Sequence, residues 1–407
     1  MRSIVASIFG SFRCSGAFLF PVLAGLLLTM SLSACVGADA PGTDTPTELR
    51  GVWLTNVDSD VLRSQEEIDA AMAFLAEHHF NAVFPVVWND GYTLYPSAVA
   101  DSVYGVRIDP AYEGRDPLAE IVEAAHQHGM AVIPWFEFGF SSGHGSPNPG
   151  PVLQAQPSWA ARDTSGEVLT KNEFRWMNPY RPAVRDFLAA LLLEVVRNYN
   201  VDGVQGDDRL PAQPVEGGYS AYTKALYAQS HNGQPPPASP RDSSFMRWRA
   251  RLLNDFAGRI YREVKATDAS LQVSWAPSVY PWSYHEYLQD WPTWIRDGHS
   301  DLVHPQVYRR DTARYRTTLE SQRPDSVNLP ASSRHNTYPG VLIKVGDYRI
   351  SGAALLHMIR TNRAEGYDGE ILFFYEGLRE NGNALADTLR ATVYREKARL
   401  PFSVSGL

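Results

Sequence analysis

Residues 201–210 read Val-Asp-Gly-Val-Gln-Gly-Asp-Asp-Arg-Leu, a short apolar and glycine-containing run that ends in two carboxylates. Such a run predicts a strand covered on both faces, with polar groups at its C-terminal tip. In parallel α/β folds, the chemistry is usually found at that tip. Because side chains alternate along a strand, Gln205 and Asp207 share one face and Asp208 lies on the other, so we expect different roles for the two acids. The alternative is that they cap a helix or solvate a turn, which explains Asp208 well.

From residue 48 onward the chain repeats a strand followed by a helix. Eight such units favour an α/β fold of the (β/α)8 TIM-barrel type over a doubly wound sheet. The insertions 90–114, 141–180 and 211–242 are rich in Pro and Gly and follow strand ends, so we expect long loops that form a groove on one face. The expected strands are 50–56, 82–88, 131–138, 201–207, 272–277, 302–308, 342–345 and 371–375, and the expected helices are 66–78, 117–128, 182–199, 245–267, 287–297, 314–323, 352–365 and 383–397.

Residues 1–35 have the pattern of a bacterial secretory signal: an arginine-containing start, an apolar run over 17–30, and Leu-Ser-Ala-Cys at 32–35. The last four residues are typical of a lipobox, in which Cys35 is acylated and anchors the protein to a membrane. An uncleaved membrane anchor is the alternative, although the apolar run is short for one. We therefore expect an exported protein that is lipid-anchored to the cell envelope, with the periplasmic side of the outer membrane as one location. Residues 36–47 then form a flexible linker, 48–398 the catalytic domain and 399–407 a tail.

Charge and cysteine content exclude several classes of function. The two cysteines are Cys14 and Cys35, both inside the predicted signal, which leaves none for a disulfide or a cysteine-based metal site. The formal net charge is −8, and an acidic protein is a poor partner for nucleic acid. We therefore expect no nucleic-acid partner, no metal and no cofactor, although a structural cation at Asp207 and Asp208 stays open.

The expected strand ends are rich in residues that bind sugars. Flat aromatic rings stack on the apolar faces of pyranoses, while amides and carboxylates hydrogen-bond to hydroxyls. The alternative for any one of these aromatics is that it fills the core. The residues at or near strand ends are Trp53, Trp88, Asn89, Asp90, Trp135, Trp275, His304, Gln306, Tyr308 and Tyr375.

Several segments resemble the glycoside-hydrolase-10-like lipoproteins of bacterial envelopes. This resemblance runs from about residue 48 to the end of the eighth strand, and it implies a (β/α)8 barrel that cleaves glycosidic bonds. The implied substrate is a polysaccharide, the glycan strands of peptidoglycan. The segments are Arg-Gly-Val-Trp-Leu (50–54), Asn-Ala-Val-Phe (81–84), Pro-Trp-Phe (134–136), Met-Asn-Pro (177–179), Asp-Gly-x-x-x-Asp-Asp (202–208) and Pro-Gln-Val-Tyr (305–308).

The segment 202–207 is also similar to the fourth strand of retaining α-glycosidases, which implies that Asp207 is the nucleophile, or the base in an inverting enzyme. A second carboxyl must then donate a proton. Glu137 follows two aromatic residues whose apolar surroundings would raise its pKa, so it is the first candidate. Glu376 comes second and Asp311 third, and Asp208 is retained as a further catalytic candidate. The fifth strand tip, 273–277, lacks the acid of the α-glycosidase pattern, so the identity of the donor stays open.

Five further residues have expected supporting roles. Gln205 is placed to orient the Asp207 carboxylate, and Asn178 in the third long loop is a candidate sugar ligand. His304, Gln306 and Tyr308 alternate along the sixth strand and are expected to line the pocket floor, with a buried structural role as the equal alternative for His304.

Three other functions are alternatives to glycoside hydrolysis. Gly-Phe-Ser-Ser-Gly at 139–143 matches the nucleophile elbow of serine hydrolases, but the Pro-rich residues after it cannot form the required helix. A metal-dependent deacetylase needs a histidine-rich ligand set that the sequence lacks. The stronger rival is a non-catalytic glycan-binding lipoprotein. A second carboxyl facing Asp207 at a glycosidase distance would favour the enzyme.

Overall fold

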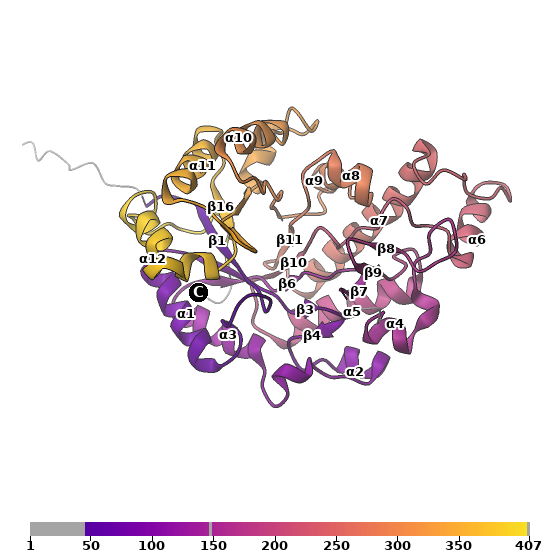
Figure 1. Ribbon diagram of the computed structural model, residues 1–407, viewed down its shortest axis with the longest axis horizontal. Coiled ribbons are helices and arrows are strands. Elements are labelled where there is room, and N and C mark those ends of the chain that lie inside the picture. Colours follow the sequence, from indigo (N-terminus) through magenta and orange to yellow (C-terminus); the bar gives the residue numbers. More distant parts are fainter. Residues whose placement is uncertain (1–44, 146–148, 405–407) are drawn as a thin grey trace, which may run out of the picture. The chain divides into compact units, whose positions relative to one another are not determined.

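Parallel strands form the centre of the fold, with helices around them (Figure 1). The computed structural model describes residues 45–145 and 149–404. One sheet has the order β13-β16-β1-β2-β5, the other has the order β12-β11-β10-β6, and all pairings within both are parallel. These strands are β1 (Leu49–Leu54), β2 (Ala82–Pro85), β5 (Ala131–Val132), β6 (Trp135–Phe136), β10 (Gly203–Gly206), β11 (Gln272–Trp275), β12 (Leu302–Val303), β13 (Gly340–Leu342) and β16 (Gly369–Phe373).

The helices between these strands begin where the sequence supplies capping groups. The side chain of Ser64 accepts a hydrogen bond from the backbone of Glu67 at the start of α1, and proline occupies the first turn of α3 and α5. The buried residues of these helices pack against strands that are themselves almost fully buried, as expected for a sheet covered on both sides. The helices are α1 (Gln65–Glu77), α3 (Pro117–Gln127), α5 (Pro182–Asn198), α7 (Ser243–Thr267), α9 (Trp291–Arg296), α10 (Thr312–Ser321), α11 (Gly352–Ala364) and α12 (Glu376–Ala391).

The expected alternation of strands and helices is observed, and several boundaries differ. The expected strand 131–138 is interrupted at Pro134, which lacks the N–H that a ladder needs, so β5 pairs in one sheet and β6 in the other. Likewise, β12 ends before Pro305. The expected helix 287–297 is replaced by two short helices, α8 (Trp282–Tyr287) and α9. The last helix begins at Glu376, earlier than expected, and contains non-helical residues at 380–383.

The long insertions and other loops contain short elements that the sequence pattern did not predict. They include two hairpins, β3–β4 and β8–β9, and β7 adds to the second of these. A third hairpin, β14–β15, follows β13. These elements are β3 (Trp88–Asn89), β4 (Tyr92–Thr93), α2 (Ala98–Tyr104), η1 (Pro110–Tyr112), β7 (Ser141–Gly143), α4 (Pro151–Ala155), η2 (Pro157–Trp159), β8 (Thr170–Lys171), β9 (Phe174–Trp176), α6 (Ala221–Ser230), η3 (Ala331–Asn336), β14 (Lys344–Val345) and β15 (Tyr348–Arg349).

Glycine at the end of β10 allows the chain to turn tightly after the strand. A Cβ atom at Gly206 would lie 2.5 Å from both the backbone oxygen of Leu210 and the ring of Trp275. A larger residue is therefore excluded where the strand gives way to Asp207. Gly139, at φ 49°, similarly allows the loop after β6 to approach the backbone of Arg209, and Phe140 N donates to Arg209 O at 3.0 Å. These two close approaches bring Asp207 and Glu137 to the same place.

The described residues from Thr45 onward belong to one compact unit. The first part of the predicted tail pairs with the start of the domain, since Thr47 and Arg399 form a parallel bridge. The predicted signal, Cys35 and most of the predicted linker lie outside the described residues. Within the described part of the chain, no helix combines the length and apolarity needed to cross a bilayer.

Candidate active site

Asp207 follows β10 directly, and both of its carboxylate oxygens accept hydrogen bonds. Gln306 Nε2 donates to Oδ1 at 2.8 Å, and Arg209 Nη2 donates to Oδ2 at 2.9 Å. Its backbone oxygen accepts from Gln289 Nε2 at 2.9 Å. Only 2 % of Asp207 is exposed. The carboxylate is therefore fixed in orientation, and both contacts stabilise its ionised form.

Arg209 connects Asp207 to the other acids of the site. Its Nη2 atom also lies 3.5 Å from Oε1 of Glu137, and its Nη1 atom lies 3.0 Å from Oδ1 of Asp208. Its Nε donates to the backbone oxygen of Glu137 at 3.0 Å. The ring of Phe174 lies 4.5 Å from the guanidinium carbon, so aromatic packing restrains the cation as well.

Glu137 follows β6 and lines a pocket of about 330 Å³. Asn89 Nδ2 donates a short hydrogen bond to its Oε2 atom. Burial raises the pKa of the Glu137 carboxyl, and this effect is opposed by Arg209 and Asn89. A carboxyl with a raised pKa beside a pocket is suited to donate a proton at neutral pH.

The pKa of Asp207 is also raised, first by burial, then by the nearby charge of Asp208, while Arg209 opposes the shift. Three carboxyls thus surround one guanidinium, and their mutual repulsion favours retention of a proton within the cluster. The proton is best accommodated on Glu137, because its 3.5 Å contact with Arg209 is longer than the 2.9 Å contact of Asp207. The site therefore contains the two kinds of carboxyl that glycoside hydrolysis uses.

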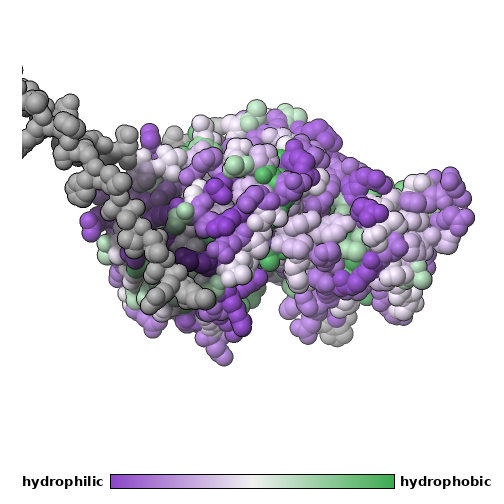
Figure 2. Space-filling view, turned by 90° about the horizontal axis from the view of Figure 1, so that it is seen from above, coloured by the Kyte–Doolittle hydropathy of each residue, from purple (hydrophilic) through white to green (hydrophobic). Residues whose placement is uncertain are grey.

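The pocket has apolar walls and acidic groups. Figure 2 shows hydrophobic residues in a recess between mainly hydrophilic regions of one face. Aromatic surfaces with a few polar groups are suited to a pyranose ring. The lining residues are Thr55, Val57, Asp58, Asn89, Asp90, Glu137, Phe138, His144, Phe174, Val345, Phe373 and Phe374.

The structure corrects the expectation that Gln205 orients Asp207. Gln205 Oε1 accepts from Trp53 Nε1 at 2.7 Å, and Gln205 Nε2 donates to Ser274 Oγ at 2.8 Å. Both bonds are buried inside the sheet region. The orienting amide comes instead from Gln306, one of the residues expected on the pocket floor. Tyr308, from the same segment, is partly exposed and its ring stacks on Phe373 at 5.2 Å.

Four residues predicted to contact substrate are buried in other roles. Trp88 packs on Phe187 and donates to Gly139 O, while Trp275 packs on Trp294 and donates to His299 O. Asn178 Nδ2 donates to the hydroxyls of Ser220 and Thr223, which joins two loops. His304 is fully buried with its Nδ1 against Tyr338 O, and burial lowers its pKa to about 3.

Trp53 and Trp135 are buried as well, at the centre of the aromatic cluster beneath Phe373. Their burial favours the alternative that these tryptophans fill the core. Tyr375 is also buried and packs on Phe74. Of the aromatic residues predicted at strand ends, Tyr308 is the one that keeps a partly exposed ring.

Of the other acid candidates, Glu376 and Asp311 lie outside this cluster, whereas Asp208 belongs to it. Glu376 Oε1 accepts from Ser59 Oγ at 2.7 Å and from the backbone of Asp60, at the start of α12. Asp311 caps α10 by accepting from Arg314 N at 2.8 Å. Asp208 is paired with Arg209. The geometry therefore assembles Glu137, and neither Glu376 nor Asp311, with Asp207.

Sequence reasoning missed Arg209 and most of the apolar wall. Arg209 was visible as the one cation directly after two acids at a strand tip, a signal for a charge cluster. Phe138, Phe174, Val57 and Val345 come from loops and hairpins whose folding no periodic pattern indicates.

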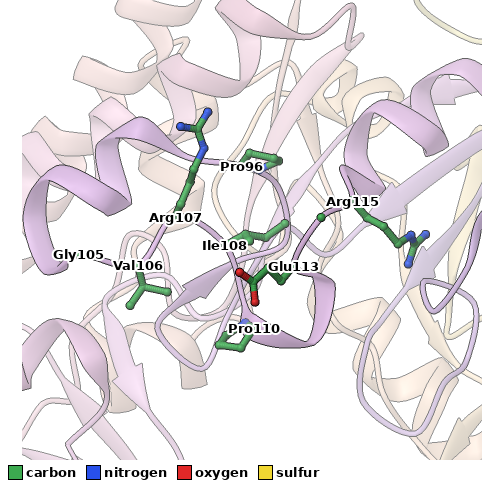
Figure 3. A pocket seen from close by; sticks show the side chains of 9 residues that line it. Pro96, Gly105, Val106, Arg107, Ile108, Pro110, Glu113 and Arg115 are labelled. Carbon is green, nitrogen blue, oxygen red and sulfur yellow. The ribbon is translucent and has the colours of Figure 1, made fainter.

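A larger cavity, of about 580 Å³, lies in the loop that precedes α3. Its lining includes Ile108 and Pro110, and Figure 3 shows Glu113 between them while Arg107 and Arg115 extend away. It contains none of the residues around Asp207, so we assign the chemistry to the smaller pocket. Across the described residues, no group of three or more His, Cys, Asp or Glu side chains is arranged to hold a metal ion.

Solved structures with a similar fold are glycoside hydrolases. The glycoside hydrolase domain of PgaB (BpsB) from Bordetella bronchiseptica superposes with a TM-score of 0.61 and 15% identity, covering 84% of this chain and 99% of that one. The catalytic domain of a β-amylase from Paenibacillus polymyxa gives 0.59 and 11%, covering 87% of this chain and 100% of that one. These similarities establish a TIM-barrel-like α/β fold.

The sequence defines the family more closely. Residues 48–352 match the model of the glycosyl hydrolase-like 10 family, so the chain belongs to this family and is a glycosidase. Glycosyl hydrolase DigH of Escherichia coli (strain K12) is 23% identical over 325 residues, which cover 69% of this chain and 71% of that protein. Glycosyl hydrolase YngK of Bacillus subtilis (strain 168) is 22% identical over 296 residues, 64% of this chain and 54% of that longer protein.

Proposed function

We propose that this glycosidase cleaves the glycan strands of peptidoglycan, with Asp207 as nucleophile and Glu137 as proton donor. The observation that supports the pair most strongly is their shared contact with Arg209. Oδ2 of Asp207 and Oε1 of Glu137 lie 2.9 and 3.5 Å from the same Nη2 atom, so these oxygens are closer together than the sum of those distances.

This upper limit favours a retaining mechanism. Retaining enzymes hold their carboxyl groups about 5–5.5 Å apart, whereas inverting enzymes leave about 6.5–9.5 Å for a water molecule. Glu137 would protonate the leaving oxygen while Asp207 bonds to the anomeric carbon. Water would then attack that carbon and give a proton to Glu137, and the bond to Asp207 would break.

We infer that the two parallel sheets belong to one closed (β/α)8 barrel. The third strand contributes β5 to one sheet and β6 to the other, and a parallel bridge joins Val86 to Trp135. On the opposite side, bridges join Val303 to Thr337 and Gln306 to Gly340, next to β12 and β13. Pairing around this ring would bring every strand end to one face, as the proposed site requires.

The proposed substrate rests on the sequence resemblance to envelope lipoproteins and on the predicted lipobox at Cys35. An aromatic pocket with carboxyl and amide groups is compatible with an amino-sugar polymer. We also propose that the protein is exported and anchored by a lipid on Cys35. Replacing Cys35 with alanine should move the protein from the membrane fraction to the soluble fraction, and unchanged partition would contradict the anchor.

The decisive experiment measures release of soluble sugar fragments from purified peptidoglycan, intact and amidase-treated. The parent is compared with Asp207→Asn and Glu137→Gln, and Glu376→Gln serves as the matched control. We expect loss of release in the first two variants and retention in the control. Equal release by the parent and Asp207→Asn would show that Asp207 is structural.

A second candidate, non-catalytic glycan binding, is favoured by the low exposure of Asp207 and its engagement with Arg209 and Gln306. If the parent itself releases no fragments but binds the glycan, this role becomes the better account.

A further inference from the structure

Three large hydrophobic residues are exposed in the described part of the chain, and all follow strands of the parallel sheets. They are Val57 at 54 %, Trp282 at 47 % and Val345 at 38 % exposure. Val57 follows β1, Trp282 opens α8 after β11, and Val345 ends β14 after β13. All three therefore belong to loops on the face that carries Asp207 and Glu137. Exposed apolar groups gathered on one functional face indicate a binding surface.

Two of these residues already belong to the active-site pocket. Val57 and Val345 line it together with Glu137 and Phe373. Trp282 is absent from that lining and belongs to α8, which Figure 1 shows on the side of β10 and β11 away from β16. The exposed tryptophan is therefore separate from the pocket that Glu137 lines.

Tyr287 connects Trp282 to the β8–β9 hairpin. The two rings lie 5.4 Å apart, and the Tyr287 hydroxyl accepts from Asn172 Nδ2 at 3.0 Å. Burial raises the pKa of that hydroxyl, and the charge of Asp208 raises it further. Strand β9 thus links the cluster to Trp282, because its Phe174 packs on Arg209 and its Trp176 packs on Tyr287.

Salt bridges and aromatic packing fix the segment that carries Trp282. Lys171 Nζ contacts Glu286 Oε2 at 2.8 Å and Glu216 Oε1 at 3.1 Å, which ties the β8–β9 hairpin to α8 and to the loop after β10. Trp176 packs on the same Tyr287 ring at 5.9 Å. A tryptophan that served only the core would be buried in such a setting, whereas this ring keeps about half of its surface in solvent.

We propose that Trp282 is a distal glycan-binding subsite, on which a pyranose of a long chain stacks while another segment of that chain occupies the Val57–Val345 pocket. A flat indole offers the apolar surface that a sugar ring covers. With binding groups on both sides of the carboxylates, the enzyme cleaves within chains. This inference rests on the proposed function and extends it to the substrate's length.

The test uses Asp207→Asn as a non-cleaving parent and follows binding by calorimetry. The probes are glycan chains from amidase-treated peptidoglycan, together with a disaccharide from the same source. Adding Trp282→Ala should weaken binding of long chains about five- to thirty-fold and leave disaccharide binding unchanged, with Trp282→Phe in between. His285→Ala, an exposed neighbour on α8, is the matched control.

Equal loss for the disaccharide and the long chains would overturn the subsite, as would unchanged binding by Trp282→Ala or absence of binding by the parent. Fragment release by the otherwise unmodified protein is measured in parallel. Absent release combined with length-dependent binding through Trp282 would reject the proposed hydrolysis while supporting the subsite, so the two failures are distinguishable.

Discussion

The guanidinium of Arg209 contacts the carboxylate of Asp207 at 2.9 Å, although only one residue separates them in the sequence. The same cation reaches Glu137, which follows the neighbouring strand β6, and Asp208 within its own loop. Arg209 therefore influences both the distance between the reactive carboxyls and their protonation. A change at Arg209 should alter both, which distinguishes it from a residue that only supports the fold.

Replacing Arg209 with methionine should lower kcat/KM by about 100-fold or more, because charge stabilisation of this kind supplies several kcal/mol in closed sites. Losing the cation should also raise the pKa of Asp207 further, because Arg209 opposes the effect of burial. Because Asp207 acts in its ionised form, the acidic limb of the pH–rate profile should move to higher pH. Arg209→Lys should retain part of the activity. The control is Arg241→Met, which removes a rim arginine paired with Glu286, and a similar shift there would contradict the assignment.

Gln306 and Gln205 should respond differently to replacement by leucine. Gln306→Leu removes a donor to Asp207, so we expect kcat to fall about 10- to 100-fold while KM changes little. Gln205→Leu leaves Trp53 Nε1 and Ser274 Oγ without their buried partner and should cost about 1–3 kcal/mol for each unsatisfied group. Steady-state kinetics and urea unfolding of both variants provide the comparison. A larger loss of kcat in Gln205→Leu would restore it as the orienting residue.

The alternation of strands and helices and the position of Asp207 were predictable from sequence, because both depend on local patterns. Strand β10 is buried on each face and ends in charge, and that is a local property of residues 201–208. The split at Pro134 was missed because a continuous apolar run masks the missing N–H donor.

The site itself depends on pairs that are distant in sequence. Gln306 lies 99 residues from Asp207, and nothing local indicates that its amide, rather than that of Gln205, reaches the carboxylate. Trp88 and Trp275 illustrate the same limit, because residues at a strand end can point toward the helices instead of the pocket. Phe174, which lines the pocket, belongs to a hairpin whose pairing is set by tertiary contacts.

Replacing Glu137 and replacing Glu376 should have different effects on activity, which tests the two candidate proton donors. Glu137→Gln should abolish the alkaline limb of the pH–rate profile, because the group whose raised pKa defines that limb no longer titrates. Its loss of activity should be much smaller on an aryl glycoside with an acidic leaving group, which departs without protonation. Glu376→Gln should stay within about twofold of the parent on both substrates, since its carboxylate binds Ser59. The reverse result would transfer the role of donor to Glu376.

Asp207→Asn should stabilise the folded protein at neutral pH. Burial raises the pKa of Asp207 above its unfolded value, so the native state binds the proton more tightly and loses stability as the pH rises above about 4. Asparagine avoids this cost and keeps the shape of the side chain, so we expect a higher free energy of unfolding at pH 7. The gain should vanish below about pH 4, where aspartate is protonated in both states. Urea unfolding at both pH values measures this difference, with Asp311→Asn at the cap of α10 as the control. A less stable Asp207→Asn protein at pH 7 would contradict this prediction. It would mean that the contacts of Asp207 with Arg209 and Gln306 contribute more free energy than burial of the charge costs, so that the ionised carboxylate stabilises the fold.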